Sequence, residues 1–288
     1  MADQSHRSVA ISGSNGYVGS ILADAFTAAG WQVIALQRRP SAYSQIGYEL
    51  TSGPSQPLPE GVDCVVHCAF AFGAYSANVV GTRQLLAAAD RAAAKSFVLI
   101  SSMSAYDGTA QAYGRAKLEC EALVTGYGGT SLRLGLVHGR TNDAMIGALR
   151  RVAGLPFVPV LAPDSHQFLA HADDVARCVV DIAEHRPERL RVLGVAHPQP
   201  VLFSDLMREL HAAVSSRPFR ALPVPVALVD RALMIKEAIG LNGGFRRDSL
   251  AGLTKPAPNV PNVDYWASRG VEFQAALAAQ PERELVAR

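Results

Sequence analysis

Residues 8–30 read SVAISGSNGYVGSILADAFTAAG: a short β-branched run, three glycines spaced three apart, then apolar residues at helical spacing. The first run predicts a strand and the last predicts a helix. Between them, Gly13 permits a tight turn, Gly16 lets the backbone approach a pyrophosphate, and Gly19 lets the helix pack closely on the strand. The N-terminus of such a helix offers amide groups to phosphates. The stretch therefore predicts a dinucleotide-binding turn.

The alternation of strand and helix patterns continues to about residue 140. Strand-like runs that are apolar throughout, separated by helical runs, indicate a parallel sheet covered by helices on both faces. The predicted fold class is α/β, a doubly wound parallel Rossmann sheet with a smaller, mostly C-terminal lobe. The predicted strands are 8–12, 31–37, 63–69, 96–102 and 131–139, and the predicted helices include 17–30, 77–94 and 111–126.

The residues after the second predicted strand favour one nicotinamide cofactor. Enzymes that bind NAD usually place an acidic residue there for the ribose 2′-hydroxyl, whereas an arginine accommodates the 2′-phosphate of NADP. This chain has ALQRRP, with Gln37 at the acidic position and Arg38 and Arg39 after it. NADP(H) is therefore favoured over NAD(H).

The pattern loosens after residue 140, which suggests two regions. Residues 1–140 are predicted to form the NAD(P)-binding Rossmann domain and residues 141–288 the substrate-binding region. A helix at 172–185 and a strand at 189–196 predict that residues 168–196 return to the Rossmann sheet. The last quarter is rich in proline and glycine, which predicts irregular segments.

Composition narrows the function classes. An apolar share of 49% with 18% charged residues is typical of a globular protein, and a net charge of +2 gives no reason to expect nucleic acid or a membrane as a partner. No apolar run is long enough to span a bilayer and the start has no signal-peptide pattern, so a cytoplasmic protein is expected. The cysteines, Cys64, Cys68, Cys120 and Cys178, contain no CxxC pair and are predicted to be buried and reduced.

Residues 100–117, ISSMSAYDGTAQAYGRAK, carry the catalytic signal. Tyr113 and Lys117 share one helix face because they are four residues apart. A neighbouring ammonium lowers the pKa of a tyrosine, and a nearby serine hydroxyl can hold the oxygen of a substrate carbonyl or carbinol. The set suits proton transfer coupled to hydride transfer.

At these residues the sequence resembles the extended short-chain dehydrogenase/reductases, also called the NAD-dependent epimerase/dehydratase family. The resemblance covers roughly residues 8 to 200. It rests on seven motifs in the family's order, which are GSNGYVG, VDCVVHCA, NVVGTRQLL, VLISSMSAY, YGRAK, LRLGLVHG and FLAHADDVA.

The resemblance implies a role for each matching residue. Tyr113 would be the general acid/base, Lys117 would lower its pKa and bind the nicotinamide ribose, and Ser102 would hold the reacting oxygen, with Ser101 and Ser104 as alternatives. The implied cofactor-binding residues are Gly13, Asn15, Gly16, Tyr17, Val18, Gly19, Arg38, Arg39, Cys68, Ala69, Phe70, Asn78, Tyr113 and Lys117, and the implied substrate residues are Ser102, Ser104, His138 and Arg246.

For several of these positions a structural role is the alternative to a role in ligand binding. His138 either faces the cavity or is a satisfied loop histidine, and Arg246 either meets a substrate diphosphate or belongs to a solvated face. His166 and His171 lack the spacing of a known metal motif, so no metal site is predicted.

The sequence also departs from the family pattern. Ser102 and Tyr113 are eleven residues apart, as are His67 and Asn78, and these intervals are longer in many sugar-nucleotide enzymes of the family. The pocket is therefore expected to be more open or to take a smaller substrate. Residues 51–61 contain too many prolines for a helix, which leaves the adenine contact undefined. No acidic residue follows Ser102 directly, so dehydration is disfavoured.

Three functions remain. The first is an NADP-dependent oxidoreductase or epimerase acting on a sugar nucleotide or similar carbonyl/carbinol compound, with Tyr113 as acid/base. The second is a reductase of a small non-sugar carbonyl compound. The third is a non-catalytic NADP(H)-binding sensor or assembly protein, against which the presence of Ser102, Tyr113 and Lys117 argues. The family often pairs through helices matching 77–94 and 111–126, so a homodimer is expected, with a monomer as the alternative.

Overall fold

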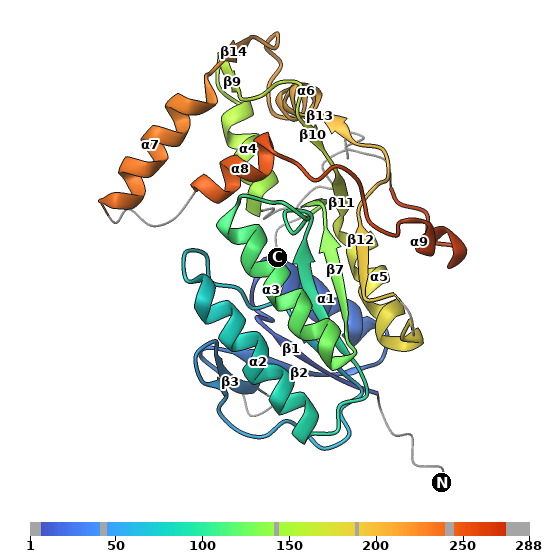
Figure 1. Cartoon of the computed structure of the whole chain (residues 1–288). Coiled ribbons are helices and arrows are strands. Elements are labelled where there is room, and N and C mark those ends of the chain that lie inside the picture. Colours follow the sequence, from blue (N-terminus) through green and yellow to red (C-terminus); the bar gives the residue numbers. More distant parts are fainter. Residues whose placement is uncertain (1–6, 41–44, 141–143, 188–189, 240–244, 275–288) are drawn as a thin grey trace, which may run out of the picture.

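The computed structural model describes residues 7–40, 45–140, 144–187, 190–239 and 245–274 (Figure 1). Within them an eight-stranded sheet has the order β12-β7-β6-β5-β1-β2-β3-β4, and every neighbouring pair is parallel except β3 and β4. The predicted Rossmann fold class is confirmed. The strands are β1 (Ser8–Ser12), β2 (Gln32–Gln37), β3 (Gln45–Glu49), β4 (Gly53–Pro54), β5 (Cys64–His67), β6 (Phe97–Ser102), β7 (Thr130–Leu134) and β12 (Val192–Val195).

The central strands are buried on both faces because they carry no polar alternation. Ile11 of β1, for example, lies in register between Ala35 of β2 and Val66 of β5. Helices α1 (Tyr17–Ala28) and α5 (Ala172–His185) pack against each other on one face of the sheet, and α2 (Tyr75–Arg91) and α3 (Ala112–Tyr127) do so on the other. The chain leaves β1 toward β2 and returns through β5 on the opposite side, so a crevice opens at the carboxyl ends of these strands.

A smaller lobe lies beyond one end of the sheet (Figure 1). It has its own apolar core, which includes Ile146, Val158, Phe203, Met207 and Leu253. Its elements are β8 (Leu136–His138), α4 (Ala144–Ala153), β9 (Val158–Val160), β10 (His166–Gln167), β11 (Leu169–His171), β13 (Val201–Leu202), α6 (Phe203–Val214), β14 (Ala221–Pro223), α7 (Val226–Ala238) and α8 (Arg247–Thr254).

After the smaller lobe begins, β12 pairs in parallel with β7 and forms one edge of the eight-stranded sheet. The predicted strand at 131–139 is divided at Gly135 into β7 and β8, because Gly135 lies so close to the Phe168 carbonyl that a side chain would not fit. The sequence did not predict that residues near the C-terminus pack against the Rossmann sheet. There α9 (Asp264–Ser268) buries Trp266, whose indole Nε1 donates to the carbonyl oxygen of Gly194 in β12 at 2.6 Å.

Two further expectations concern the outside of the fold. The proline-rich residues 51–61 contain no helix and supply the short strand β4. Helices α2 and α3 lie side by side, but dimerisation through them stays a prediction. Among the described residues, no helix is long and apolar enough to cross a membrane.

Candidate functional site

The crevice is a cavity of about 630 Å³ whose floor is the glycine turn between β1 and α1. Gly13 has φ +68°, and a Cβ atom there would lie 2.9 Å from Ala69 Cα. A Cβ at Gly19 would overlap the carbonyl oxygen of Gly13. Side chains are therefore excluded from the turn, which leaves room for a bound group. The lining includes the predicted residues Gly13, Asn15, Gly16, Tyr17, Val18, Gly19, Arg38, Cys68, Ala69, Phe70, Ser102, Tyr113 and Lys117.

Helix α1 presents its N-terminus to this cavity. It begins directly after Gly16, has no side-chain cap and carries no acidic residue in its first turn. Its first amides have no partner within the helix, and the helix dipole adds partial positive charge there. This cradle suits the pyrophosphate of a dinucleotide. The residues present therefore fit a nicotinamide cofactor.

One wall of the cavity is held by a buried serine and histidine. Ser12 Oγ lies 2.6 Å from His67 Nδ1 and accepts from the backbone amides of Cys68 and Ala69, both at 3.2 Å. Burial lowers the pKa of His67 to about 3, so this imidazole stays neutral near pH 7. His67 therefore orders the end of β5 and has no charge to offer a ligand.

Asn78 holds the loop that follows this wall. Its Oδ1 accepts from the Ala71 amide at 2.7 Å, and its Nδ2 donates to the carbonyl oxygens of Ala71 and Ala74 at 2.8 and 3.0 Å. The side chain is buried and does not line the cavity, so Asn78 acts on the loop rather than on a ligand.

The three predicted catalytic residues meet at the inner end of the cavity. Tyr113 is hydrogen-bonded to Ser102, and Lys117 Nζ donates to the Ile100 carbonyl oxygen at 2.7 Å. Burial raises the pKa of Tyr113, with the Ser102 hydrogen bond acting in the opposite direction. Burial lowers the pKa of Lys117 from 10.5 to about 8. Solvent exclusion thus favours the neutral form of both groups. The pKa of Tyr113 is raised rather than lowered as the sequence suggested, because burial outweighs the lowering by the Ser102 hydrogen bond.

Two aromatic rings pack against the Tyr113 ring. The Phe70 ring meets Tyr113 edge-on at 5.0 Å between centroids and lies 4.4 Å from Lys117 Nζ. The Phe72 ring stacks on Tyr113 at 5.4 Å while 52% exposed. Phe72 was not predicted as a site residue. The run AFAFGAY at 69–75 nevertheless indicates that several aromatic rings lie close together after β5.

A second cavity of about 210 Å³ adjoins the first and shares Ser102 and Tyr113 with it. Helix α8 forms its outer wall. Most of its lining is apolar, and none of the lining residues in the described part of the chain is a lysine or arginine. The residues not shared with the larger cavity are Met103, Ser104, Leu136, Met145, Gln167, Phe168, Asp248, Ser249, Gly252, Leu253, Pro256 and Ala257.

Asp248 is the ionisable group that α8 brings to this cavity. Its carboxylate accepts a hydrogen bond from the backbone amide of Tyr113, and burial raises its pKa. The smaller lobe is thereby fixed to the first turn of α3, at Tyr113. Sequence reasoning missed Asp248 because more than a hundred residues separate it from Tyr113.

Other predicted residues lie outside the two cavities. Arg39 is exposed and lines neither, whereas its neighbour Arg38 lines the larger one. His138 is buried with its ring 5.2 Å from that of His171, so it packs behind the site rather than facing substrate. Arg246 lies against the loop at Gly73. Glu49, which was not predicted, lines the larger cavity at the end of β3.

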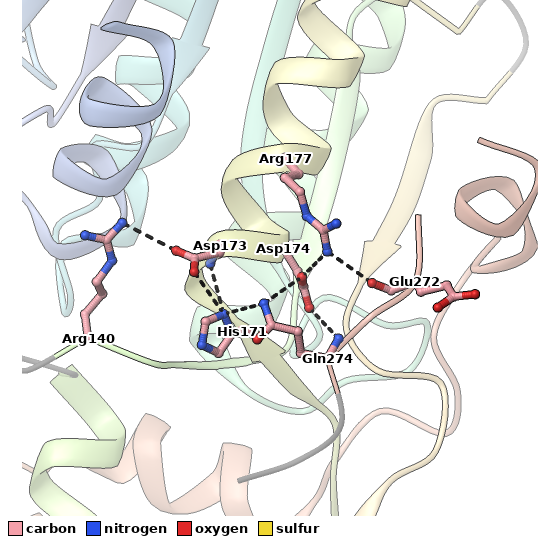
Figure 2. Close-up of polar contacts among 7 residues, drawn as sticks. All are labelled: Arg140, His171, Asp173, Asp174, Arg177, Glu272 and Gln274. Atoms are coloured by element: carbon pink, nitrogen blue, oxygen red, sulfur yellow. Dashed lines mark hydrogen bonds and ion pairs between the residues drawn. The ribbon is translucent and has the colours of Figure 1, made fainter. Parts of the chain in front are cut away.

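The histidine and aspartates near residue 171 have structural partners. His171 caps α5 by accepting from the Asp173 amide at 3.2 Å, and the buried Asp174 accepts from the Gln274 amide at 2.8 Å and pairs with Arg177 (Figure 2). The network ties the C-terminal segment to α5. Among the described residues, no group of three potential ligands could hold a metal ion.

Comparison with known proteins agrees with this geometry. Residues 9–194 match the sequence profile of the NAD dependent epimerase/dehydratase family. A protein of Caulobacter vibrioides named ceramide reductase is 26% identical over 257 residues, which cover 81% of this chain and 79% of that protein.

Solved structures share the fold. The human epimerase family protein SDR39U1, determined with NADPH, has a TM-score of 0.71 at 18% identity and covers 92% of this chain and 94% of its own. The UDP-N-acetylglucosamine 4-epimerase of Bacillus cereus has a TM-score of 0.61 at 18% identity and covers 93% and 99%. The Thermus thermophilus UDP-glucose 4-epimerase, complexed with NAD, has a TM-score of 0.61 at 18% identity and covers 76% and 86%.

Proposed function

The chain belongs to the NAD-dependent epimerase/dehydratase family and is an NAD(P)-dependent oxidoreductase or epimerase, and we propose that it uses NADPH to reduce the carbonyl group of a largely apolar substrate. The observation that carries this proposal is the lining of the smaller cavity. Its walls are mostly apolar and, among the described residues, include no lysine or arginine. A substrate diphosphate would need such cations, whereas an aliphatic carbonyl compound would not. The Caulobacter relative, named as a reductase of the lipid ceramide, gives further support.

The charges at the end of β2 support NADP(H) as the cofactor. Arg38 lines the cavity where the adenosine ribose of a dinucleotide would lie, and Gln37 beside it brings no negative charge. A guanidinium there favours a 2′-phosphate. The human structure determined with NADPH is consistent with this choice.

Each catalytic side chain has a role in the proposed reduction. The bound cofactor supplies a hydride to the carbonyl carbon. Ser102 holds the carbonyl oxygen, and Tyr113 donates its phenolic proton to that oxygen as negative charge develops there. Because burial raises the pKa of Tyr113, the phenol keeps its proton near neutral pH, which suits an acid. Lys117 places an ammonium beside the phenolate that remains.

The test compares tyrosine variants with an NADPH oxidation assay. The substrates are aliphatic ketones of increasing chain length, with UDP-glucose and UDP-N-acetylglucosamine tested for epimerisation. Tyr113→Phe should lower kcat about 100-fold or more while NADPH binding, followed by fluorescence, is retained. Tyr106→Phe is the matched control, because the one hydrogen bond of the Tyr106 hydroxyl within the described residues is donated to the Lys255 carbonyl oxygen at 3.4 Å. Turnover of a UDP-sugar with retained NAD, and none of any ketone, would overturn the proposal.

A sugar-nucleotide epimerase is the second candidate. Epimerases acting on UDP-sugars share the fold, and the Bacillus cereus structure covers nearly all of both chains. Arg246, which lies against the loop at Gly73, is the side chain that could meet a diphosphate. Arg246→Ala should then abolish epimerisation, whereas it should leave the reduction of an uncharged ketone unchanged.

A further inference from the structure

The outward side of α7 is apolar although it faces solvent. Leu228, Ile235 and Ile239 are 62%, 60% and 65% exposed. Their spacing of seven and four residues places them on one side of the helix. We call these three side chains the α7 face. In Figure 1, α7 (orange) projects from the smaller lobe with one side against α8.

Three charged residues of α7 contact α8 or the residues just before it. Asp230 pairs with Arg247 Nε at 2.7 Å, Glu237 accepts from the Arg247 amide at 3.2 Å, and Lys236 donates to the Phe245 carbonyl at 3.2 Å. A surface helix normally buries its apolar side and exposes its polar side. In α7 these three groups attach the helix to the protein, whereas the apolar side and Arg231 remain outside, which marks a docking surface.

More exposed apolar side chains lie at the tip of the same lobe. Leu155 and Phe157 precede β9, and Leu222 lies on β14, which pairs with β9 and leads into α7. We call these three residues the lobe tip. Figure 1 shows β9, β14 and the start of α7 at one end of the molecule.

Arginines accompany both sets. Arg220 lies over the Phe157 ring at 5.9 Å, and Arg217 and Arg231 are exposed. None of the three forms an ion pair with any residue in the part of the chain that the structure describes. Exposed aliphatic and aromatic side chains interspersed with arginines are the pattern of interfacial membrane binding, in which the apolar groups enter the acyl boundary and the cations meet anionic headgroups.

We propose that the α7 face and the lobe tip dock together on the surface of a lipid bilayer that carries anionic headgroups. A second copy of the chain fits less well, because it would bring the same exposed arginines to both sides of the contact, whereas anionic headgroups would neutralise them. The overall net charge of +2 gave no reason to expect a membrane. The separation of apolar and acidic groups on α7 does give a reason to expect membrane binding. This separation exists only in the folded chain.

Docking would also bring the substrate cavity close to the bilayer. Helix α7 packs on α8, and α8 forms the outer wall of that cavity. An apolar substrate dissolved in the membrane could then enter without crossing water. This last consequence rests on the proposed reduction of an apolar carbonyl compound, whereas the docking itself does not.

The test is sedimentation of the full-length protein with vesicles. One set is phosphatidylcholine alone, and the other contains about 30% phosphatidylglycerol. Wild type should bind the anionic vesicles and release as salt is raised. The double variant Leu228→Glu/Ile235→Glu should bind about 10-fold more weakly or worse. Leu202→Glu is the matched control: it makes the same kind of change at an exposed residue on β13, outside both sets, and should bind like wild type.

Three outcomes would overturn the proposal. They are absence of wild-type binding to anionic vesicles, equal binding to both vesicle types, and a dimer in solution that the double variant disrupts without any vesicle binding. Circular dichroism melting and NADPH titration show whether the double variant is folded. Reduction of a short, water-soluble ketone without vesicles tests the proposed activity separately, so failure of docking and failure of the reductase are distinguishable.

Discussion

Replacement of Lys117 by methionine is expected to stabilise the protein while it destroys activity. Lys117 is buried and donates a single described hydrogen bond, to the Ile100 carbonyl oxygen. Its pKa falls from 10.5 to about 8. One pKa unit corresponds to about 1.4 kcal/mol, so the charged side chain costs the folded state about 3 kcal/mol near pH 7. Losing the hydrogen bond offsets about 1–2 kcal/mol of that cost, which leaves Lys117→Met more stable by about 1–2 kcal/mol.

The pH dependence of this difference identifies its cause. Between about pH 8 and 10.5 the folded wild type binds fewer protons at Lys117 than the unfolded chain does, so its stability rises with pH there. Below about pH 8 the penalty is fully present. Between about pH 7 and pH 9.5, the free energy of unfolding of the wild type should therefore rise by about 1–2 kcal/mol relative to that of the variant.

Urea denaturation of both proteins at these two pH values measures the effect. Lys95→Met serves as the control, because Lys95 is exposed and pairs with Asp63 at the surface. Its free energy of unfolding should change by no more than about 1 kcal/mol, equally at both pH values. If the stabilities of wild type and Lys117→Met ran parallel across this pH range, a lowered pKa of a buried Lys117 would be refuted.

Three further substitutions have defined outcomes. Glu121→Ala removes a buried carboxylate that accepts from Ser101 at 2.5 Å and from Arg133 Nη2 at 2.7 Å, so the free energy of unfolding in urea should fall by about 3–5 kcal/mol; a loss below about 1 kcal/mol would contradict this. Arg38→Ala should weaken NADPH binding about 10-fold or more and leave NADH binding unchanged, as fluorescence titration would show. Asp248→Asn should remove from the kcat/KM profile an acidic inflection that lies above the usual aspartate range, because burial raises the pKa of this carboxyl; an unchanged profile would place Asp248 outside the reaction.

The local geometry at the glycine turn and at Tyr113 and Lys117 follows from short stretches of the sequence. Gly13, Gly16 and Gly19 lie in the expected turn, because strand, turn and helix follow one another within twelve residues and each imposes its own residue type. Tyr113 and Lys117 meet in one cavity since helical spacing alone brings them to one face. Sequence patterns of this kind determine the local geometry directly.

The parts that depend on distant contacts were not predictable. The choice between Arg38 and Arg39 depends on which way the chain leaves β2, and only Arg38 lines the cavity. His138 lies within the predicted strand 131–139 and ends β8, but its ring packs against His171 of β11. Asp248 reaches the site through the fold of the smaller lobe. In that region the prolines and glycines of the sequence indicate where elements are interrupted, but they do not predict how the elements pack.

The site is built from two parts of the chain, and under the proposed function the part that includes α8 would determine which substrate is accepted. The loops that follow β5 and β6 are short, and the space they leave beside Tyr113 is enclosed by Asp248, Ser249, Gly252 and Leu253 of α8. These four residues lie beyond the region 9–194 that matches the family profile. The matched region contains the glycine turn and Ser102, Tyr113 and Lys117, so under the proposed function it would determine the chemistry. Substitutions along the inner side of α8 should therefore alter KM for the carbonyl compound and leave NADPH affinity unchanged, whereas substitutions in the glycine turn should do the reverse.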